Sequence, residues 1–230
     1  LPIKQGELIN TQNIRHAADS FTSQKTHALN WQAPDISKWE KREFKGYYRE
    51  DGRVGTANNW LFVPLVFCEN RNLDVIEDSL LKELGYSSDA PYHELTRNLI
   101  RYYRSGNDLS LVEIPTNGDD QKNQAEKKVF ENIDGIKFLK HQGGCGGTRE
   151  DSEVLCQLLA GYICHPNTAG VTVLSLGCQH AQIDLLKSKI EAICPEYNRP
   201  LLIYEQQQYS SEKTLLGQAI KDTFIELSRA

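Results

Sequence analysis

The sequence predicts an α/β fold with a mainly parallel sheet of about five strands covered by helices. From Gly46 onward, apolar runs of strand length alternate with stretches of helical period, which is typical of parallel strands joined by helices. The chain has 230 residues and a hydrophobic fraction of 39%, enough for a sizeable core. No apolar run approaches the roughly 18 residues that a membrane span requires, so we expect a soluble protein.

An extended linker is expected before this fold. Residues 1–18 are turn-rich and too few to bury a core by themselves. Residues 19–45 are polar and show neither helical nor strand period, which is typical of a linker. The chain begins without Met and contains none, which favours a segment of a longer protein. We therefore assign the α/β domain to residues 46–230.

Five apolar runs have the length and composition of strands. The first contains Pro64, which cannot donate to a sheet, so this strand is expected at an edge or with a bulge. The five predicted strands are Trp60–Phe67, Leu109–Ile114, Ile136–Leu139, Val171–Leu176 and Leu201–Tyr204.

Six amphipathic stretches predict helices around these strands. The clearest begins after Thr148, which Asp151 follows at the spacing of a capping box. Its predicted apolar face consists of Val154, Leu155, Leu158, Leu159, Tyr162 and Ile163. The strands and helices together indicate a Rossmann-like three-layer arrangement. The predicted helices are Leu73–Leu84, Tyr92–Tyr103, Gln121–Asn132, Asp151–Ile163, Gln179–Ile193 and Glu212–Leu227.

Three of the six cysteines follow predicted strands: Cys68, Cys145 and Cys178. In a parallel sheet these positions share the carboxyl edge, where ligands bind in open α/β folds. Neighbouring strands are about 4.8 Å apart, so the three thiols could ligate one metal centre. Each could instead be a small buried packing residue, but for the three together we favour function. The other three are expected to pack: Cys156, Cys164 and Cys194.

Two further segments carry candidate site residues. The loop from His141 to Gly147 has glycines that let backbone N–H groups approach an anion, and His141 could be a metal ligand, a general base or a structural histidine. Before the first strand, Arg49 and Arg53 could hold a carboxylate, or could simply pair with Asp51 in a solvated turn. The spacing does not choose between these alternatives.

Five sequence blocks, in this order, resemble the signature blocks of the altronate/galactarate dehydratase family, over Phe44 to Gln208. The resemblance implies that residues 1–18 end a small β-clip (SAF) domain and that a large C-terminal catalytic domain belongs to the same enzyme. The blocks are FKGYYREDGRVGTANN, VPLVFCENRN, HQGGCGGTREDS, HPNTAGVTVLSLGCQHAQ and YEQQQ.

The resemblance implies dehydration of a sugar acid such as D-altronate to a 2-keto-3-deoxy acid, with Fe²⁺ or Mn²⁺, or with an iron–sulfur cluster on the three cysteines. A divalent cation on the substrate stabilises the enediolate while a base removes the proton. Alternatives are galactarate or sulfolactate as substrate, or a non-catalytic dimerisation module. The candidate catalytic residues are His141, Arg53 and Arg49, and the candidate substrate-binding residues are Asn70, Gly144, Gly146, Thr148 and Arg149.

Charge and cysteine usage indicate the partners and the compartment. A net charge of −5 argues against binding to nucleic-acid phosphates, which requires clustered Lys and Arg. Six cysteines without a signal-peptide pattern indicate reduced thiols in a cytoplasmic enzyme. We therefore expect a small sugar-acid substrate, the C-terminal domain of the same chain and a second subunit in a homodimer as partners, and neither nucleic acid nor membrane.

Overall fold

The computed structural model describes residues 32–87, 91–114 and 128–230. The chain divides into two units, Leu1–Phe44 and Lys45–Ala230. In the described part of the first unit, the cationic groups of Lys38 and Arg42 lie over the Trp39 ring, 5.1 and 4.0 Å from its centre. Residues 1–18, expected to end a β-clip domain, lie outside the described residues. That assignment and the linker boundaries stay predictions.

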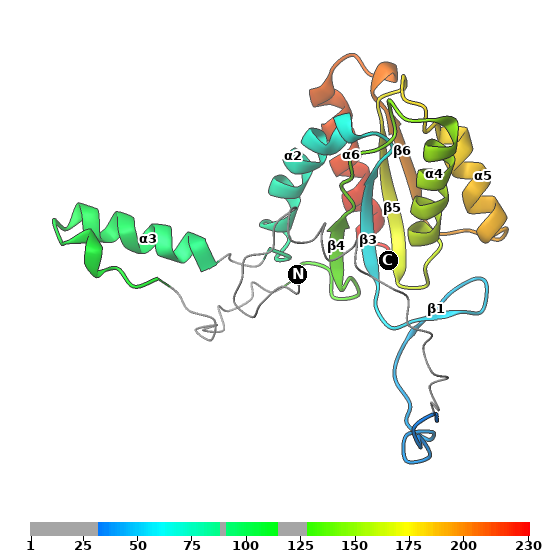
Figure 1. Ribbon diagram of the computed structural model, residues 1–230, viewed down its shortest axis with the longest axis horizontal. Helices are drawn as coiled ribbons and strands as arrows, with labels where there is room; N and C mark the ends of the chain where they lie inside the picture. The colour runs from blue at the N-terminus through cyan, green and yellow to red at the C-terminus, as the bar shows by residue number, and fades with distance from the viewer. Residues whose placement is uncertain (1–31, 88–90, 115–127) are drawn as a thin grey trace, which may run out of the picture. The chain divides into compact units, whose positions relative to one another are not determined.

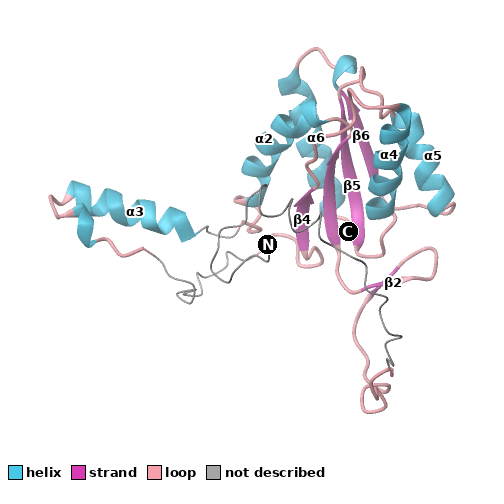
Figure 2. Cartoon of the chain, in the orientation of Figure 1, coloured by secondary structure: helices cyan, strands magenta, loops and turns pink. Residues whose placement is uncertain are grey.

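The second unit is built on a parallel sheet, shown in Figure 2. Its described strands are β3 (Asn59–Pro64), β4 (Gly135–Phe138), β5 (Thr168–Ser175) and β6 (Leu201–Glu205), in the spatial order β4-β3-β5-β6. All neighbouring strands pair in parallel. A short antiparallel hairpin, β1 (Tyr47–Tyr48) with β2 (Val54–Gly55), precedes β3.

Helices cover both faces of this sheet, so the predicted three-layer α/β fold is confirmed (Figure 1). On one face, α2 (Asn70–Leu81) and α6 (Glu212–Leu227) pack on Trp60 and Phe62 of β3. On the other face, α4 (Arg149–Ile163) and α5 (Ile183–Ile193) pack on Leu61 and Val63. Successive β3 side chains thus point to opposite cores, as strand geometry requires.

The predicted strand Leu109–Ile114 is wrong. Leu109–Leu111 form a 3₁₀ turn, η2, started by the Asp108 carboxylate, which accepts a hydrogen bond from the Ser110 N–H. This segment follows the confirmed helix α3 (Pro91–Arg104), and Leu109, Leu111 and Ile114 in it are exposed. The sheet in the described residues therefore has four strands rather than five. Of the predicted helix Gln121–Asn132, residues 121–127 lie outside the described ranges and 128–132 are not helical.

Pro64 was expected to place its strand at an edge or to mark a bulge, but β3 lies inside the sheet between β4 and β5. Pro64 is tolerated because it is the last residue of the strand, and the next ladder bond comes from the Leu65 N–H to the Leu174 carbonyl at 2.8 Å. The irregularity in β3 is at the opposite end, between Asn59 and Trp60.

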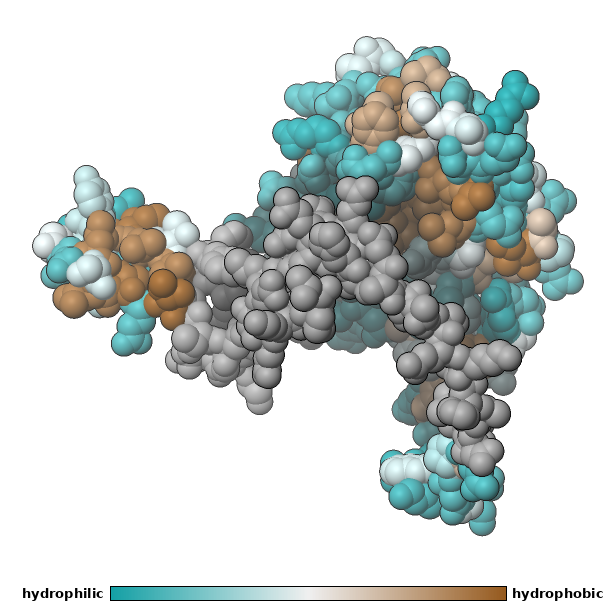
Figure 3. Space-filling view, viewed as in Figure 1, coloured by the Kyte–Doolittle hydropathy of each residue, from teal (hydrophilic) through white to brown (hydrophobic). Residues whose placement is uncertain are grey.

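The capping box of α4 is confirmed, because the Thr148 hydroxyl accepts from the Asp151 N–H and the Asp151 carboxylate accepts from the Thr148 N–H. The predicted apolar face is only half right. Leu159 and Ile163 are buried, but an outer stripe is exposed, comprising Val154 at 67%, Leu158 at 56% and Tyr162 at 49%. Figure 3 shows apolar side chains at the surface over this helix. No helix in the described parts of the chain is long and apolar enough to cross a membrane.

Candidate functional site

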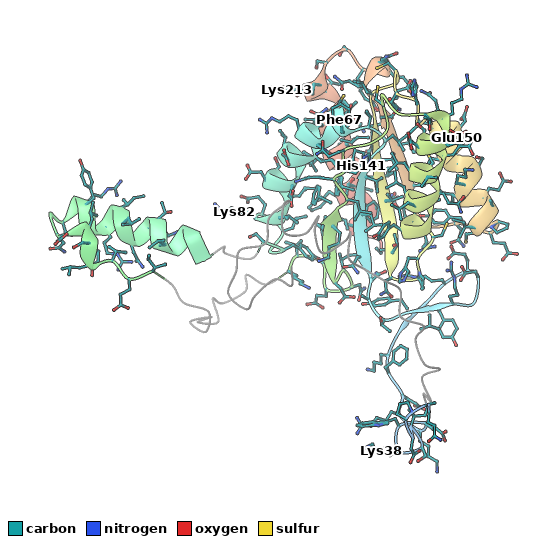
Figure 4. All side chains as sticks on the ribbon, in the orientation of Figure 1. Lys38, Phe67, Lys82, His141, Glu150 and Lys213 are labelled. Atoms are coloured by element: carbon teal, nitrogen blue, oxygen red, sulfur yellow. The ribbon has the colours of Figure 1, made fainter. Side chains whose placement is uncertain are left out.

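The three cysteines that follow strands lie on one edge of the sheet. Cys68 lies in the 3₁₀ turn η1 (Phe67–Glu69) after β3, Cys145 in the loop between β4 and α4, and Cys178 in the loop between β5 and α5. Because the strands are parallel, all three loops leave the carboxyl edge, where Phe67, His141 and Glu150 also lie in Figure 4. All three cysteines are exposed.

Backbone hydrogen bonds join these three loops. The Phe67 N–H donates to the Gly143 carbonyl at 3.0 Å, which connects the loop of Cys68 to that of Cys145. The Gly144 carbonyl accepts from the N–H groups of His180 and Ala181 at 3.0 and 3.2 Å, which connects the loop of Cys145 to that of Cys178. The glycine-rich loop is therefore the central piece of the site.

Gly144 explains why this loop needs glycine. Its φ of +97° falls in the left-handed region, and a Cβ there would lie 2.1 Å from the Leu65 carbonyl oxygen and 2.7 Å from the Val66 Cα. Gly146 also has a positive φ, +78°, but a Cβ there would meet nothing within 4 Å. Gly144 is thus fixed by close packing, whereas Gly146 borders open space next to Cys145.

His141 holds this loop against β3. Its Nε2 donates to the Pro64 carbonyl at 2.7 Å, and its Nδ1 accepts from the Gly143 N–H at 3.1 Å, which assigns the neutral Nε2–H tautomer. Its own carbonyl accepts from the Asn70 side-chain amide at 2.8 Å. Both ring nitrogens are hydrogen-bonded to the backbone, which is the geometry expected if His141 is a structural histidine. The general-base role of His141 stays a prediction.

The other predicted substrate contacts lie at two helix starts on the same edge. Asn70 is the first residue of α2, and its Oδ1 is buried without a hydrogen-bond partner. Thr148 caps α4, and Arg149, the first residue of that helix, is exposed. The partial positive charge of the α4 N-terminus therefore lies next to Cys145 and the glycine loop.

Glu69 was missed by the sequence reasoning. It is only 1% exposed, its Oε2 accepts from the Asn72 amide at 2.8 Å, and its Oε1 has no partner. Burial raises the pKa of its carboxyl, the Asn72 hydrogen bond opposes this, and the charge of Glu212 adds to it. The sequence did offer a sign of this residue, because Glu69 lies between Cys68 and Asn70, where the first predicted strand ends and the next helix begins.

Arg49 and Arg53 are not brought together with the cysteines. Arg49 donates to the Pro166 carbonyl at 2.6 Å and to Asn58 Oδ1 at 2.7 Å, and Arg53 donates to the Cys164 carbonyl at 2.6 Å. Those carbonyls precede β5, at the amino edge of the sheet, about 20 Å along a strand from the carboxyl edge. The two side chains fasten the β1–β2 hairpin to the end of α4, and their catalytic roles stay predictions.

Cysteine is the residue type that usually holds iron–sulfur clusters, so the three cysteines at the carboxyl edge suit iron by their chemistry but not by their arrangement. No group of three or more His, Cys, Asp or Glu side chains in the described ranges is arranged to hold a metal ion. The cysteines that were expected to pack differ in exposure from the three at the carboxyl edge. They are at most 3% exposed: Cys156, Cys164 and Cys194. Burial raises the pKa of both Cys156 and Cys164 to about 11.

Comparisons with known proteins agree with the sequence blocks. Residues 46–228 match the model of the D-galactarate dehydratase/Altronate hydrolase second domain. The chain is 28% identical over 154 residues to an altronate dehydratase of Bacillus subtilis and 24% identical over 155 residues to one of Escherichia coli. Each alignment covers 67% of this chain but only 22% and 23%, respectively, of those enzymes. No solved structure matches the chain.

Proposed function

We propose that this chain is part of a cytoplasmic sugar-acid dehydratase, because it belongs to the D-galactarate dehydratase/altronate hydrolase family and matches the second domain of that family. The enzyme would convert D-altronate to 2-keto-3-deoxy-D-gluconate and water. The chain aligns with less than a quarter of its relatives' length, so we propose that a C-terminal domain of the same enzyme shares the reaction.

The observation that carries this proposal is the placement of Cys68, Cys145 and Cys178 on three loops at the carboxyl edge, of which the glycine-rich loop is hydrogen-bonded to the other two. Their exposure leaves the thiols accessible to iron and to a ligand. Iron held there, as Fe²⁺ or in a cluster, would supply Lewis-acid polarisation of the substrate's carboxylate and hydroxyl, and Mn²⁺ is the alternative ion.

The chain's own residues would bind and orient the anion. The exposed Arg149 and the N–H groups at the start of α4 would supply positive charge, which Glu150 and Asp151 in the same turn partly offset. Gly144 and Gly146 shape the backbone beside Cys145, while Asn70 and Thr148 supply polar groups on the same edge. A dehydration also needs a base, and the exposed His180, whose backbone is anchored to the glycine loop, is a candidate beside His141.

Turnover by the full-length enzyme tests the proposal. After anaerobic reconstitution with iron, D-altronate, galactarate and sulfolactate are assayed with the wild type and with C68S, C145S and C178S. We expect one sugar acid to be dehydrated and each substitution to abolish turnover. C156A is the control, because this cysteine is buried at 0% exposure away from the three at the carboxyl edge and should cost stability but not activity. Full activity in all three edge variants would refute the iron site.

A second candidate function is subunit pairing, without chemistry in this domain. The exposed stripe of Val154, Leu158 and Tyr162 favours it, since these side chains lie on successive turns of one helix. This candidate predicts a homodimer that L158E converts to monomer in sedimentation velocity, with iron content and turnover insensitive to C68S, C145S and C178S. A wild-type monomer would contradict it.

A further inference from the structure

The start of α2 contains two buried oxygen atoms without partners. Glu69 Oε1 and Asn70 Oδ1 each lack a hydrogen bond, although the other polar atom of each side chain is engaged, Glu69 Oε2 by Asn72 and Asn70 Nδ2 by the His141 carbonyl. Both residues directly follow Cys68 on the carboxyl edge. Buried polar atoms are nearly always paired with protein or ordered water in folded proteins, so two consecutive exceptions mark a place where a further polar group is needed.

The surroundings of Glu69 compensate its carboxyl group only in part, through the Asn72 amide and its position at the N-terminus of α2. The side chain is 1% exposed, and no Lys or Arg of the described residues pairs with it. The charge that reaches it is that of Glu212, which has the same sign. A buried carboxyl in such a place destabilises the free protein unless something else satisfies it.

A hydroxyl group fits these two atoms better than a cation. A hydroxyl both donates and accepts, so it can pair with Glu69 Oε1 whether the carboxyl is ionised or protonated, and a second hydroxyl can donate to Asn70 Oδ1. Mg²⁺ and Ca²⁺ take about six or more oxygen ligands, which include water, and the two unpaired protein oxygens here would supply only a small part of such a shell. The favoured ligand is therefore one that carries several hydroxyls.

We propose that Glu69 and Asn70 form the hydroxyl-binding part of the substrate site, with Glu69 Oε1 and Asn70 Oδ1 accepting hydrogen bonds from neighbouring hydroxyls of a polyhydroxy acid. The identity of the ligand class rests on the proposed function. Glu69 is then a specificity residue, which selects for hydroxylated acids over plain dicarboxylates.

The test uses the full-length, iron-loaded enzyme with E69M, which removes both carboxyl oxygens at similar length, and E69Q, which keeps a polar group. E83M is the matched control, since Glu83 is exposed near the end of α2. The values of kcat and KM for D-altronate are measured, together with the shift in Tm caused by D-altronate, galactarate, the hydroxyl-free dicarboxylate adipate, and Mn²⁺ alone.

We expect E69M to raise KM roughly tenfold or more with little change in kcat, and to lose most of the Tm shift caused by the hydroxylated acids. E69Q should lie between E69M and the wild type, because its amide can still donate to a hydroxyl. Without ligand, E69M loses the unpaired Oε1 but also leaves the buried Asn72 amide without its acceptor, so E69Q is the informative variant, because its carbonyl can still accept from Asn72. The Tm of ligand-free E69Q should equal or exceed that of the wild type, whereas a purely structural Glu69 carboxylate would give a lower Tm.

Other outcomes separate this inference from the proposed function. Wild-type turnover with unchanged KM in both Glu69 variants overturns the inference alone, and so does a Glu69-dependent Tm shift with Mn²⁺ but not with hydroxylated acids. Glu69-dependent stabilisation by these acids without dehydration supports the inference and refutes the proposed function. A wild type that neither binds nor dehydrates any of them overturns both.

Discussion

At the scale of single residues, the site depends on backbone geometry that only glycine provides. Gly144 combines a φ of +97° with a Cβ position 2.1 Å from the Leu65 carbonyl, and its own carbonyl joins two of the loops that carry cysteines. Any side chain at this position must displace backbone of the loop after β3. The arrangement of the three cysteines therefore depends on a residue with no side chain.

The first prediction concerns this glycine. G144A should destabilise the protein by about 3 kcal/mol, from left-handed strain together with the clash against the backbone. G146A has a similar φ but open space, so it should cost about 1 kcal/mol. Urea unfolding measures both, and equal losses in the two variants would contradict the packing argument.

A second prediction at this scale concerns thiol reactivity. Burial raises the pKa of Cys156 and Cys164 to about 11, so at pH 8 only about a thousandth of each thiol is ionised. Iodoacetamide should therefore alkylate Cys68, Cys145 and Cys178 in the folded, metal-free protein and spare the buried pair, because the thiolate is the reactive form. Raising the pH toward 11 should increase labelling of the buried pair. Peptide mass spectrometry gives the sites, and early labelling of Cys156 would contradict the described burial.

At the scale of elements, the positions of the helices in the sequence were easier to predict than the side of each helix that faces the sheet. The bounds of α6 match the prediction and α4 begins at its capping box, because caps and helical period are local in sequence. The sequence could not show which side of α4 faces the sheet, since this helix is apolar around much of its circumference. The run Leu109–Ile114 failed for a related reason: a strand needs a partner, and composition does not report one.

The orientation of α4 gives a third prediction. L159A removes a side chain that is 3% exposed and should cost about 3 kcal/mol, whereas L158A, at 56% exposure, should change the free energy of unfolding by less than about 0.5 kcal/mol. The two positions are adjacent and chemically identical, so each serves as the control for the other. Thermal or urea unfolding of both variants measures these costs. Similar losses of unfolding free energy in L158A and L159A would show that the outer stripe of α4 is covered rather than exposed.

At the scale of the whole molecule, the sequence predicted the helix and sheet layers. It also predicted that the loops of Cys68, Cys145 and Cys178 share one edge of the sheet, because parallel topology alone determines which loops share an edge. It did not separate the arginines from that edge. Arg49 and Arg53 lie at the amino edge because their hairpin binds the loop before β5, a contact between positions more than 110 residues apart. Contacts between residues so far apart in the sequence leave no periodic pattern in it. The hydrogen bonds of His141 and the burial of Glu69 likewise cannot be recognised from the sequence.

The proposal that Cys68, Cys145 and Cys178 are ligands of one iron centre is tested by the iron content of the protein. Full-length wild type, C68S, C145S, C178S and the C156A control are reconstituted anaerobically, desalted and measured for iron per chain. Bound iron is expected in the wild type and in C156A, and each of the variants C68S, C145S and C178S should lose it. Wild-type iron content in all three edge variants would show that the metal is held elsewhere in the enzyme.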